Sequence, residues 1–519
     1  MNPFRYITSS IALVFVFQLC FAQQEKVDLQ VVSRIKDEAF NRSKVMDYLF
    51  QLTDVQGPRL TGSVNLKNAQ DWAVKQLGEI GAVNAGTEAW GTFGKGWEIQ
   101  KSYVAMTKPY YQALSGAPKA WTPGTNGVLA APVIAVKIES EEDFEKYKGK
   151  LAGKIVVIDA NIDIKPGLKP EFSRYTDEEL HKLYLNERVF SEESGAAFDR
   201  AKYRAAGRLR QKRAEFVQEE KAVAVISTRG NSMGTFYTSN GASYATNAKM
   251  PLPELEMSAE HVARLVRLAN AGKEVELELD IKTSFNLTDT VQYNVIAEIP
   301  GSDKNLKNEV VMIGAHLDSW HAATGATDNA AGCAVMMEVM RLIKTLNLSP
   351  KRTIRIALWS GEEQGILGSK GYVKSHFADP ETMTLKPEHK LLSAYYNLDN
   401  GGGKIRGIYL QGNDALRPVF ESWLLPFHDM GATTVTARNT GGTDHLPFEE
   451  VGLPGFQFIQ DEMDYDNKTH HTNMDTYDRI QKTDLMQCSA IIASFVYHTA
   501  MRDEVLVRKM LPKPKSDKK

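Results

Sequence analysis

The stretch that decides the fold runs from residue 309 to residue 363 and has three parts. They are "EVVMIGAHLD" (309–318), "AAGCAVMMEVMRLIKTLN" (330–347) and "RTIRIALWSGEE" (352–363). The first and third parts are short, nearly continuous apolar runs, whereas the middle part has the length and composition of a helix. A strand, a helix and a second apolar strand in succession are typical of parallel strands that helices cover on both faces.

The same alternation continues on either side of this stretch. Further strands are predicted from "NVIAEIPG" (294–301), "LLSAYYNLDNGG" (391–402) and "PGFQFIQ" (454–460), and further helices over 369–378, 417–431 and 482–501. Helical patterning also covers 31–54 and 66–82 near the start of the chain. The expected fold class is therefore α/β, with a mostly parallel, doubly wound mixed sheet flanked by helices.

A block in the middle of the chain has a different period. Short β-branched runs such as "VLAAPVIAVK" (128–137) and "GKIVVIDA" (153–160) are flanked by turn residues. We predict an inserted β-rich domain at 125–285, between an N-terminal part at 23–124 and a C-terminal part at 286–519. Its charged stretch at 161–220 lacks a β pattern and is interpreted as a helical excursion forming a solvated arm. The alternatives are a cover over the active-site mouth and a contact in a homodimer.

The composition and the first 22 residues limit where the protein is expected to act and which partners it is expected to have. The 519-residue chain has 62 basic and 64 acidic residues and a net charge of −2, which gives no reason to expect nucleic acid or an anionic membrane as partner. Residues 1–22 combine Arg5 with the apolar run "IALVFVFQLCFA" and predict a signal peptide cleaved after Ala22. We expect a secreted or periplasmic protein with no membrane span after cleavage. The two cysteines that then remain, Cys333 and Cys488, are predicted to be buried small hydrophobic residues.

Acids and histidines follow the predicted strands at the points where those strands end. In a doubly wound sheet, functional groups gather at this carboxyl edge. The residues concerned are His316, Asp318, Asp328, Glu362, Glu363, Asp399, His470 and His471. Taken singly, each has an ordinary explanation as a helix cap, a turn or an exposed loop residue. Taken together, they form a set of imidazoles and carboxylates that suits Zn²⁺.

The charges of this set suggest how the roles divide. Two histidines and the carboxylates of Asp328, Glu363 and Asp399 can hold two divalent cations if one carboxylate bridges them. A further carboxylate is needed to take a proton from the attacking water, and Glu362 with Glu363 provides one base and one ligand. Asp318 is expected to accept the other ring N–H of His316.

Five motifs resemble the di-zinc exopeptidases of metallopeptidase family 28, which include aminopeptidases and the carboxypeptidase Q branch. They are "GAHLDSW…GATDNAAG", "LWSGEEQGILGS", "NLDN", "GGTDHLPF" and "HHTNMDT". The resemblance covers roughly 40–110 and 286–510. It implies the zinc exopeptidase fold, and the block at 125–285 resembles the protease-associated domain that the family often carries.

The resemblance also implies roles for individual residues. Two zinc ions per chain would be bound by His316, Asp328, Glu363, Asp399 and His471, with Asp328 as the bridge and a cis peptide bond between Asp328 and Asn329. Glu362 would be the general base. His470 is the alternative to His471, although the motif spacing favours His471. Asp444 and His445 would line the substrate pocket. Apart from the resemblance, a carboxypeptidase needs a cation for the substrate carboxylate, and Arg438 is a candidate, although an ordinary surface arginine is the favoured interpretation. His321 has no role in the family pattern.

The leading hypothesis is a secreted zinc exopeptidase that hydrolyses terminal peptide bonds through metal-activated water. A glutaminyl cyclase-like acyltransferase with one zinc and a non-catalytic, receptor-like homologue are the alternatives. The complete ligand set argues against both. Whether the substrate is recognised by its amino end, its carboxyl end or both, as in a dipeptidase, stays open at this point.

Overall fold

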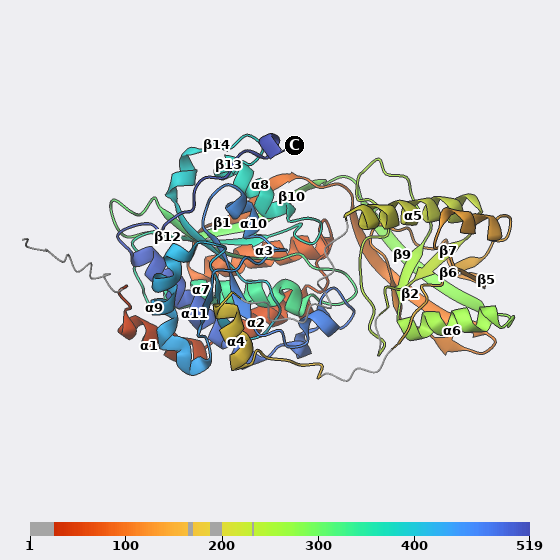
Figure 1. The fold of residues 1–519 in the computed structure, drawn as a ribbon, viewed down its shortest axis with the longest axis horizontal. Coiled ribbons are helices and arrows are strands. Elements are labelled where there is room, and N and C mark those ends of the chain that lie inside the picture. Colours follow the sequence, from red (N-terminus) through yellow and green to blue (C-terminus); the bar gives the residue numbers. More distant parts are fainter. Residues whose placement is uncertain (1–24, 165–169, 187–199, 231–232, 519) are drawn as a thin grey trace, which may run out of the picture.

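Two eight-stranded mixed sheets organise the chain, as the computed structural model shows (Figure 1). The structure describes residues 25–164, 170–186, 200–230 and 233–518. The predicted signal peptide, residues 1–22, lies outside the described residues. Within the described part of the chain, no helix is both long enough and apolar enough to cross a membrane.

The first sheet has a parallel centre and antiparallel edges. Its order is β1(Val83–Thr92), β10(Val291–Ile299), β12(Thr353–Trp359), β11(Val310–His316), β15(Leu392–Asn397), β18(Gly455–Gln460), β16(Ile405–Tyr409) and β17(Thr434–Thr436). Strands β12, β11, β15 and β18 are mutually parallel. Strand β10 joins β12 antiparallel, and β16 joins β18 antiparallel. The predicted α/β class is confirmed, and its parallel part is the centre of the sheet.

Helices cover both faces of the first sheet because its central strands have apolar side chains on each face. One face packs against α1(Leu29–Asn41), α2(Val45–Phe50), α3(Val64–Ile80), α7(Ala331–Thr345), α9(Arg417–Leu424) and α11(Lys482–Met501). The other face packs against α8(Leu367–His376) and α10(Leu446–Glu450). The short strands β13(Ala378–Asp379) and β14(Thr384–Leu385) form a separate hairpin.

The ends of helix α3 follow from its sequence. The side chain of Ser63 caps the helix by accepting the backbone N–H of Leu66. The helix ends at Gly81, whose φ of 91° is in the left-handed region that favours glycine. Both signals lie at the borders of an apolar pattern that the sequence predicted as helical.

The second sheet is built from the inserted block together with residues that precede it. Its order is β3(Gln112–Ala113), β2(Gly96–Lys108), β9(Glu276–Asn286), β5(Leu129–Val136), β6(Ile155–Ile158), β7(Ala224–Ser227), β8(Glu254–Met257) and β4(Gly116–Pro118). Helix α6(Ala259–Asn270) packs on it. Strand β2 pairs with β9 along most of its length, so strand pairing assigns 96–118 to the second sheet rather than to the predicted N-terminal part at 23–124. Because β9 is distant in the sequence, no local pattern in 96–118 predicts that these residues join the second sheet.

The charged excursion at 161–220 contains α4(Asp177–Tyr184) and α5(Arg200–Glu219). Helix α5 lies along the second sheet, whereas α4 packs beside β17 of the first sheet (Figure 1). Residues 171–186 are therefore not a solvated arm. Arg174 makes ion pairs of 2.8 Å with both Asp461 and Asp484, which are buried. The interpretation as a solvated arm was wrong for this segment, because its partners Asp461 and Asp484 lie about 300 residues away in the sequence.

Cys333 and Cys488 are free and buried, as predicted. The Sγ of Cys333 contacts the backbone carbonyl of His316 at 3.1 Å. Each thiol therefore fills space in the core of the first domain.

Candidate active site

The carboxyl ends of the central parallel strands bring the predicted residues to one edge of the first sheet. His316 is the last residue of β11, Glu362 and Glu363 follow β12, and Asp399 follows β15. His471 lies in the long loop after β18. Because these four strands are parallel neighbours, side chains that are far apart in the sequence converge in space.

One group of ligand atoms surrounds the ring of His316. Its Nε2 lies 3.1 Å from Asp328 Oδ1 and 3.3 Å from Asp399 Oδ1. All three residues are buried, and their candidate ligand atoms lie within 4.8 Å of one another. This group could hold one cation.

A second group surrounds the ring of His471. Its Nε2 lies 3.1 Å from Asp328 Oδ2 and 2.9 Å from Glu363 Oε2. His470 is farther away, with Nε2 3.9 Å from Asp328 Oδ2, and its side chain is 41% exposed. The two groups share Asp328, which presents one oxygen to each. The cis peptide bond expected between Asp328 and Asn329 is present.

The donor set fits divalent cations. Oxygens of Asp328, Glu363 and Asp399 are buried and have no hydrogen-bond partner among the described residues. Burial and the nearby Asp328 raise the pKa of Glu363 to about 7. Burial lowers the pKa of His471, but Glu363 and Asp328 outweigh it and raise that pKa to about 11. Without a cation, protons must balance these crowded carboxylates, and metal binding replaces such protons.

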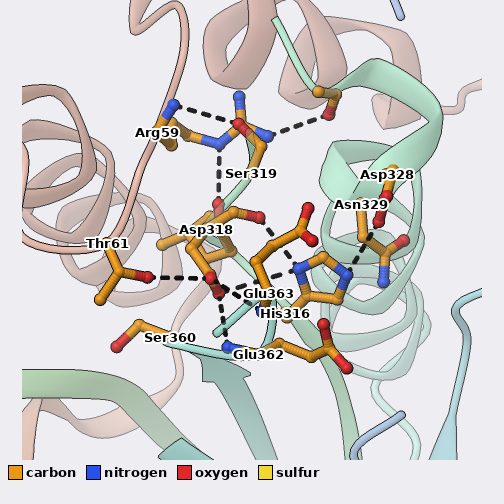
Figure 2. Close-up of polar contacts among 12 residues, drawn as sticks. Arg59, Thr61, His316, Asp318, Ser319, Asp328, Asn329, Ser360, Glu362 and Glu363 are labelled. Carbon is orange, nitrogen blue, oxygen red and sulfur yellow. Dashed lines mark hydrogen bonds and ion pairs between the residues drawn. The ribbon is translucent and has the colours of Figure 1, made fainter. Parts of the chain in front are cut away.

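Asp318 acts differently from the expectation. Nδ1 of His316 lies 2.9 Å from the backbone carbonyl oxygen of Asp318, whereas the carboxylate is 3.8 Å away. The carboxylate instead accepts the Thr61 hydroxyl at 3.0 Å and the backbone N–H groups of Glu362 and Glu363, each at 3.3 Å (Figure 2). The main chain of Asp318 therefore orients the imidazole, and its side chain holds the turn that carries the two glutamates.

Arg59 holds the loop between His316 and Asp328 and was missed from the sequence. Figure 2 shows its guanidinium beside Ser319, whose hydroxyl accepts the Arg59 backbone N–H at 3.1 Å. Among the described residues, the fully buried guanidinium donates to backbone carbonyls alone, including those of Thr324 at 2.7 Å and Gly325 at 3.0 Å. Its place in a turn-rich stretch, "VQGPRLTGSVN", gave no signal of this role.

Gly325 is required where this loop turns. Its φ is 60°, and a Cβ added there would lie 2.3 Å from Cβ of Ser319. Any larger residue would therefore displace the loop that leads to Asp328.

Asp475 fixes Asp328 from the other side and was also missed. Its Oδ1 accepts the Thr327 backbone N–H at 2.6 Å and the Thr327 hydroxyl at 2.8 Å. Its Oδ2 accepts the Asp328 backbone N–H at 3.1 Å. Asp475 belongs to the motif "HHTNMDT", so the spacing after His471 could have drawn attention to it.

Of the three residues predicted for the substrate pocket, Asp444 and His445 are buried and Arg438 is half-buried. Asp444 is buried, accepts the Ser369 hydroxyl, and has a second oxygen without a hydrogen-bond partner among the described residues. Its charge is one of those that, after burial, raise the pKa of Glu362. His445 is buried with Nε2 3.2 Å from the Thr440 carbonyl oxygen. Arg438 lies beyond β17, with its charge near Tyr409 of β16.

His321 has a structural role. Its ring is buried, with Nε2 2.7 Å from the Pro118 carbonyl oxygen. It also contacts the ring of Trp97 edge-on, with 5.1 Å between centroids. His321 therefore joins the loop of the candidate site to β2 and β4 of the second sheet.

Comparisons with known proteins identify the family of the part of the chain that carries these residues. Residues 294–496 match the model of peptidase family M28. This part of the chain is an M28 peptidase domain. Mouse carboxypeptidase Q is 26% identical over 484 residues, which cover 93% of this chain and 90% of that protein. The enzyme is accordingly a hydrolase that acts on peptide bonds.

Solved structures extend the likeness beyond the M28 domain. The M28 peptidase precursor of Shewanella amazonensis has a TM-score of 0.65 and 28% identity, covering 93% of this chain and 98% of that one. A zinc aminopeptidase from Bacillus subtilis has a TM-score of 0.56 and 21% identity, covering 88% and 95%. The second likeness supports the fold alone, and the first spans both sheets of the chain.

Proposed function

We propose that the M28 domain is a zinc-dependent exopeptidase with two zinc ions per chain. The observation that carries the proposal is the pair of ligand groups that share Asp328. The proposed ligands are His316, Asp328 and Asp399 for the first ion and His471, Glu363 and again Asp328 for the second. The relatives support zinc, since one solved neighbour is named as a zinc aminopeptidase.

Glu362 is the proposed general base. Bound divalent cations would supply the lowered pKa that makes water a nucleophile near neutral pH. The Glu362 carboxylate would accept the proton of that water and pass it to the amine that leaves. Its backbone N–H donates to the Asp318 carboxylate at 3.3 Å, which holds this half-buried residue next to the ligand Glu363.

Two neighbouring substitutions test this division of roles. Glu362→Gln is expected to keep two zinc ions per chain and to lower kcat by about 10²- to 10⁴-fold, because only proton transfer is lost. Glu363→Gln is the matched variant and is expected to lose the second zinc as well as activity. Elemental analysis and single-turnover hydrolysis distinguish the two results. Undiminished turnover in Glu362→Gln would refute the base assignment.

The acids around the proposed base favour a substrate with a free α-ammonium group. Asp444 has a spare carboxylate oxygen and lies near enough to Glu362 to affect its pKa. Hydrolysis of one dipeptide with a blocked amine and one with a blocked carboxyl group tests the direction. An aminopeptidase accepts only the second, a carboxypeptidase only the first, and a strict dipeptidase neither. Arg438→Met would impair only substrates with a free carboxylate if that arginine binds one.

The proposal includes export and a protease-associated identity for the inserted block. The supports are the charge and apolar run of residues 1–22 and the β-rich pattern of 125–285. N-terminal sequencing of the mature protein is expected to begin at Gln23. Sedimentation at micromolar concentration tests whether the chain forms a homodimer.

A further inference from the structure

The loop that carries His471 is held by residues of the inserted block. It leaves β18 at Asp461 and reaches Asp475 without forming a strand of the first sheet. His471 itself has a φ of 57°, in the left-handed region that non-glycine residues rarely adopt. Such a conformation persists only where neighbouring groups fix it.

The first set of neighbours is the segment 233–240, which lies between β7 and β8. The Thr238 backbone N–H donates to the carbonyl oxygen of His471 at 2.7 Å, and Tyr237 forms an antiparallel bridge with Thr472. The side chain of Asn473 accepts the Phe236 backbone N–H at 2.9 Å. The Asn473 backbone N–H in turn donates to the Phe236 carbonyl at 3.2 Å. These bonds hold His471 and the two residues that follow it.

The second set is the segment 171–175, at the start of the excursion. Ser173 and Met463 exchange two backbone hydrogen bonds of 2.8 and 2.9 Å. Arg174 then pairs with the buried Asp461. Glu171 accepts the side-chain N–H of Asn467 through its carbonyl oxygen at 2.8 Å. The loop is thus fastened near its start as well as at the histidine.

The ligands of the other group are held by the first sheet. His316 is the last residue of β11, and Asp399 follows β15 by two residues. Both strands lie in the parallel centre of the sheet. The two proposed zinc sites therefore differ in what supports their histidine.

We propose that segments 171–175 and 233–240 of the inserted block are positioning elements for the second zinc site and set its affinity. This inference rests on the proposed function. Groups that hold a metal ligand in place without touching the metal commonly contribute 10- to 100-fold to affinity. The inserted block would accordingly govern occupancy of the second site, while the first site stays tight without it.

The test is made on the full-length protein and removes, one at a time, the contacts of segment 233–240 and those of segment 171–175, here called the two clamps. Asn473→Ala deletes the side chain that accepts the Phe236 N–H, and Arg174→Met deletes the ion pairs at the other segment. Asn413→Ala is the matched control, because this buried asparagine donates at 2.7 Å to the Val507 carbonyl, away from the loop. Titration of the zinc-loaded proteins with a chelator resolves the release of each ion.

The expected result is a second zinc bound about tenfold more weakly in Asn473→Ala and in Arg174→Met, with the first ion and the control unchanged. Circular dichroism melting identifies any variant that fails to fold, and the other clamp variant then decides. Release profiles equal to that of the wild type, or equal weakening of both ions, would overturn the inference. If the wild type itself binds fewer than two zinc ions, the proposed function fails instead, so the two failures are distinguishable.

Discussion

Replacing Arg59 by methionine tests how the loop between His316 and Asp328 is held. Methionine has a similar length, so the change removes the charge and the donors without leaving a large cavity. The guanidinium donates five hydrogen bonds to backbone carbonyls at 2.7 to 3.0 Å. The accepting residues are Leu52, Gly57, Leu317, Thr324 and Gly325.

The magnitude follows from the number of acceptors left without a donor. A buried polar group that loses its partner costs about 1–3 kcal/mol. The Gly325 carbonyl also accepts the Ala330 backbone N–H at 3.0 Å, so four carbonyls lose their donor. Even at about 1 kcal/mol each, they give about 4 kcal/mol, a large share of the 5–15 kcal/mol typical of a folded domain. Relief of the buried charge offsets part of this cost, because burial lowers the pKa of Arg59. We expect a net loss of about 2–3 kcal/mol.

Urea unfolding in the presence of a chelator measures this loss without a contribution from metal binding. Arg59→Lys is the informative companion, because an ammonium offers three donors and keeps the charge. It is expected to fall between the wild type and Arg59→Met. A loss below about 1 kcal/mol in Arg59→Met would mean that the carbonyls find other donors, and the reasoning would be wrong.

Further predictions concern charge away from the ligand groups and the cations themselves. Glu88, 2.6 Å from His376, raises the imidazole pKa, with Glu388 on the other ring nitrogen. The ion pairs of protonated His376 therefore stabilise the fold below pH ~6.5, and this stabilisation is lost as the pH rises through the raised pKa. His376→Gln should lower the free energy of unfolding by at most about 1 kcal/mol at pH 5.5 and by nothing at pH 9, as urea unfolding measures. Lys95 is 2% exposed and has no acidic partner among the described residues. Its Nζ lies 5.2 Å from the centroid of the Phe285 ring, and burial lowers its pKa. Lys95→Met should raise stability by about 1 kcal/mol in the same assay, and an unchanged or lower value contradicts it. Zinc at 100 times the Kd of a site should stabilise the protein by about 2.7 kcal/mol for that site at pH 8. The gain should be smaller at pH 5.5, where protons compete for the ligands, and calorimetry with and without a chelator measures both.

The sequence alone predicted the parallel centre of the first sheet and the edge of that sheet at which the candidate ligands lie. Strands such as 310–316 and 353–359 are buried on both faces, so their composition alone identifies them. A ligand that follows such a strand directly, as His316 does, is placed by local chain geometry. Strands β16 and β17, at one end of the sheet, were missed because they are only five and three residues long. Strand β2 could not be assigned to its sheet because its main partner, β9, is distant in the sequence.

What holds the ligands could not be read in the same way, and the reason is physical. Thr238 holds the His471 loop through its backbone N–H, and Asp318 orients His316 through its backbone carbonyl. Every residue possesses these groups, so residue type does not predict these two contacts. Arg174 looked like one more solvated charge in a charged stretch, since nothing nearby in the sequence shows that Asp461 and Asp484 are buried. A buried acid needs a partner, and its position in the fold decides which distant cation becomes that partner. The excursion is therefore tied to the His471 loop through Arg174 and Asp461, a contact that depends on the burial of Asp461 in the folded structure.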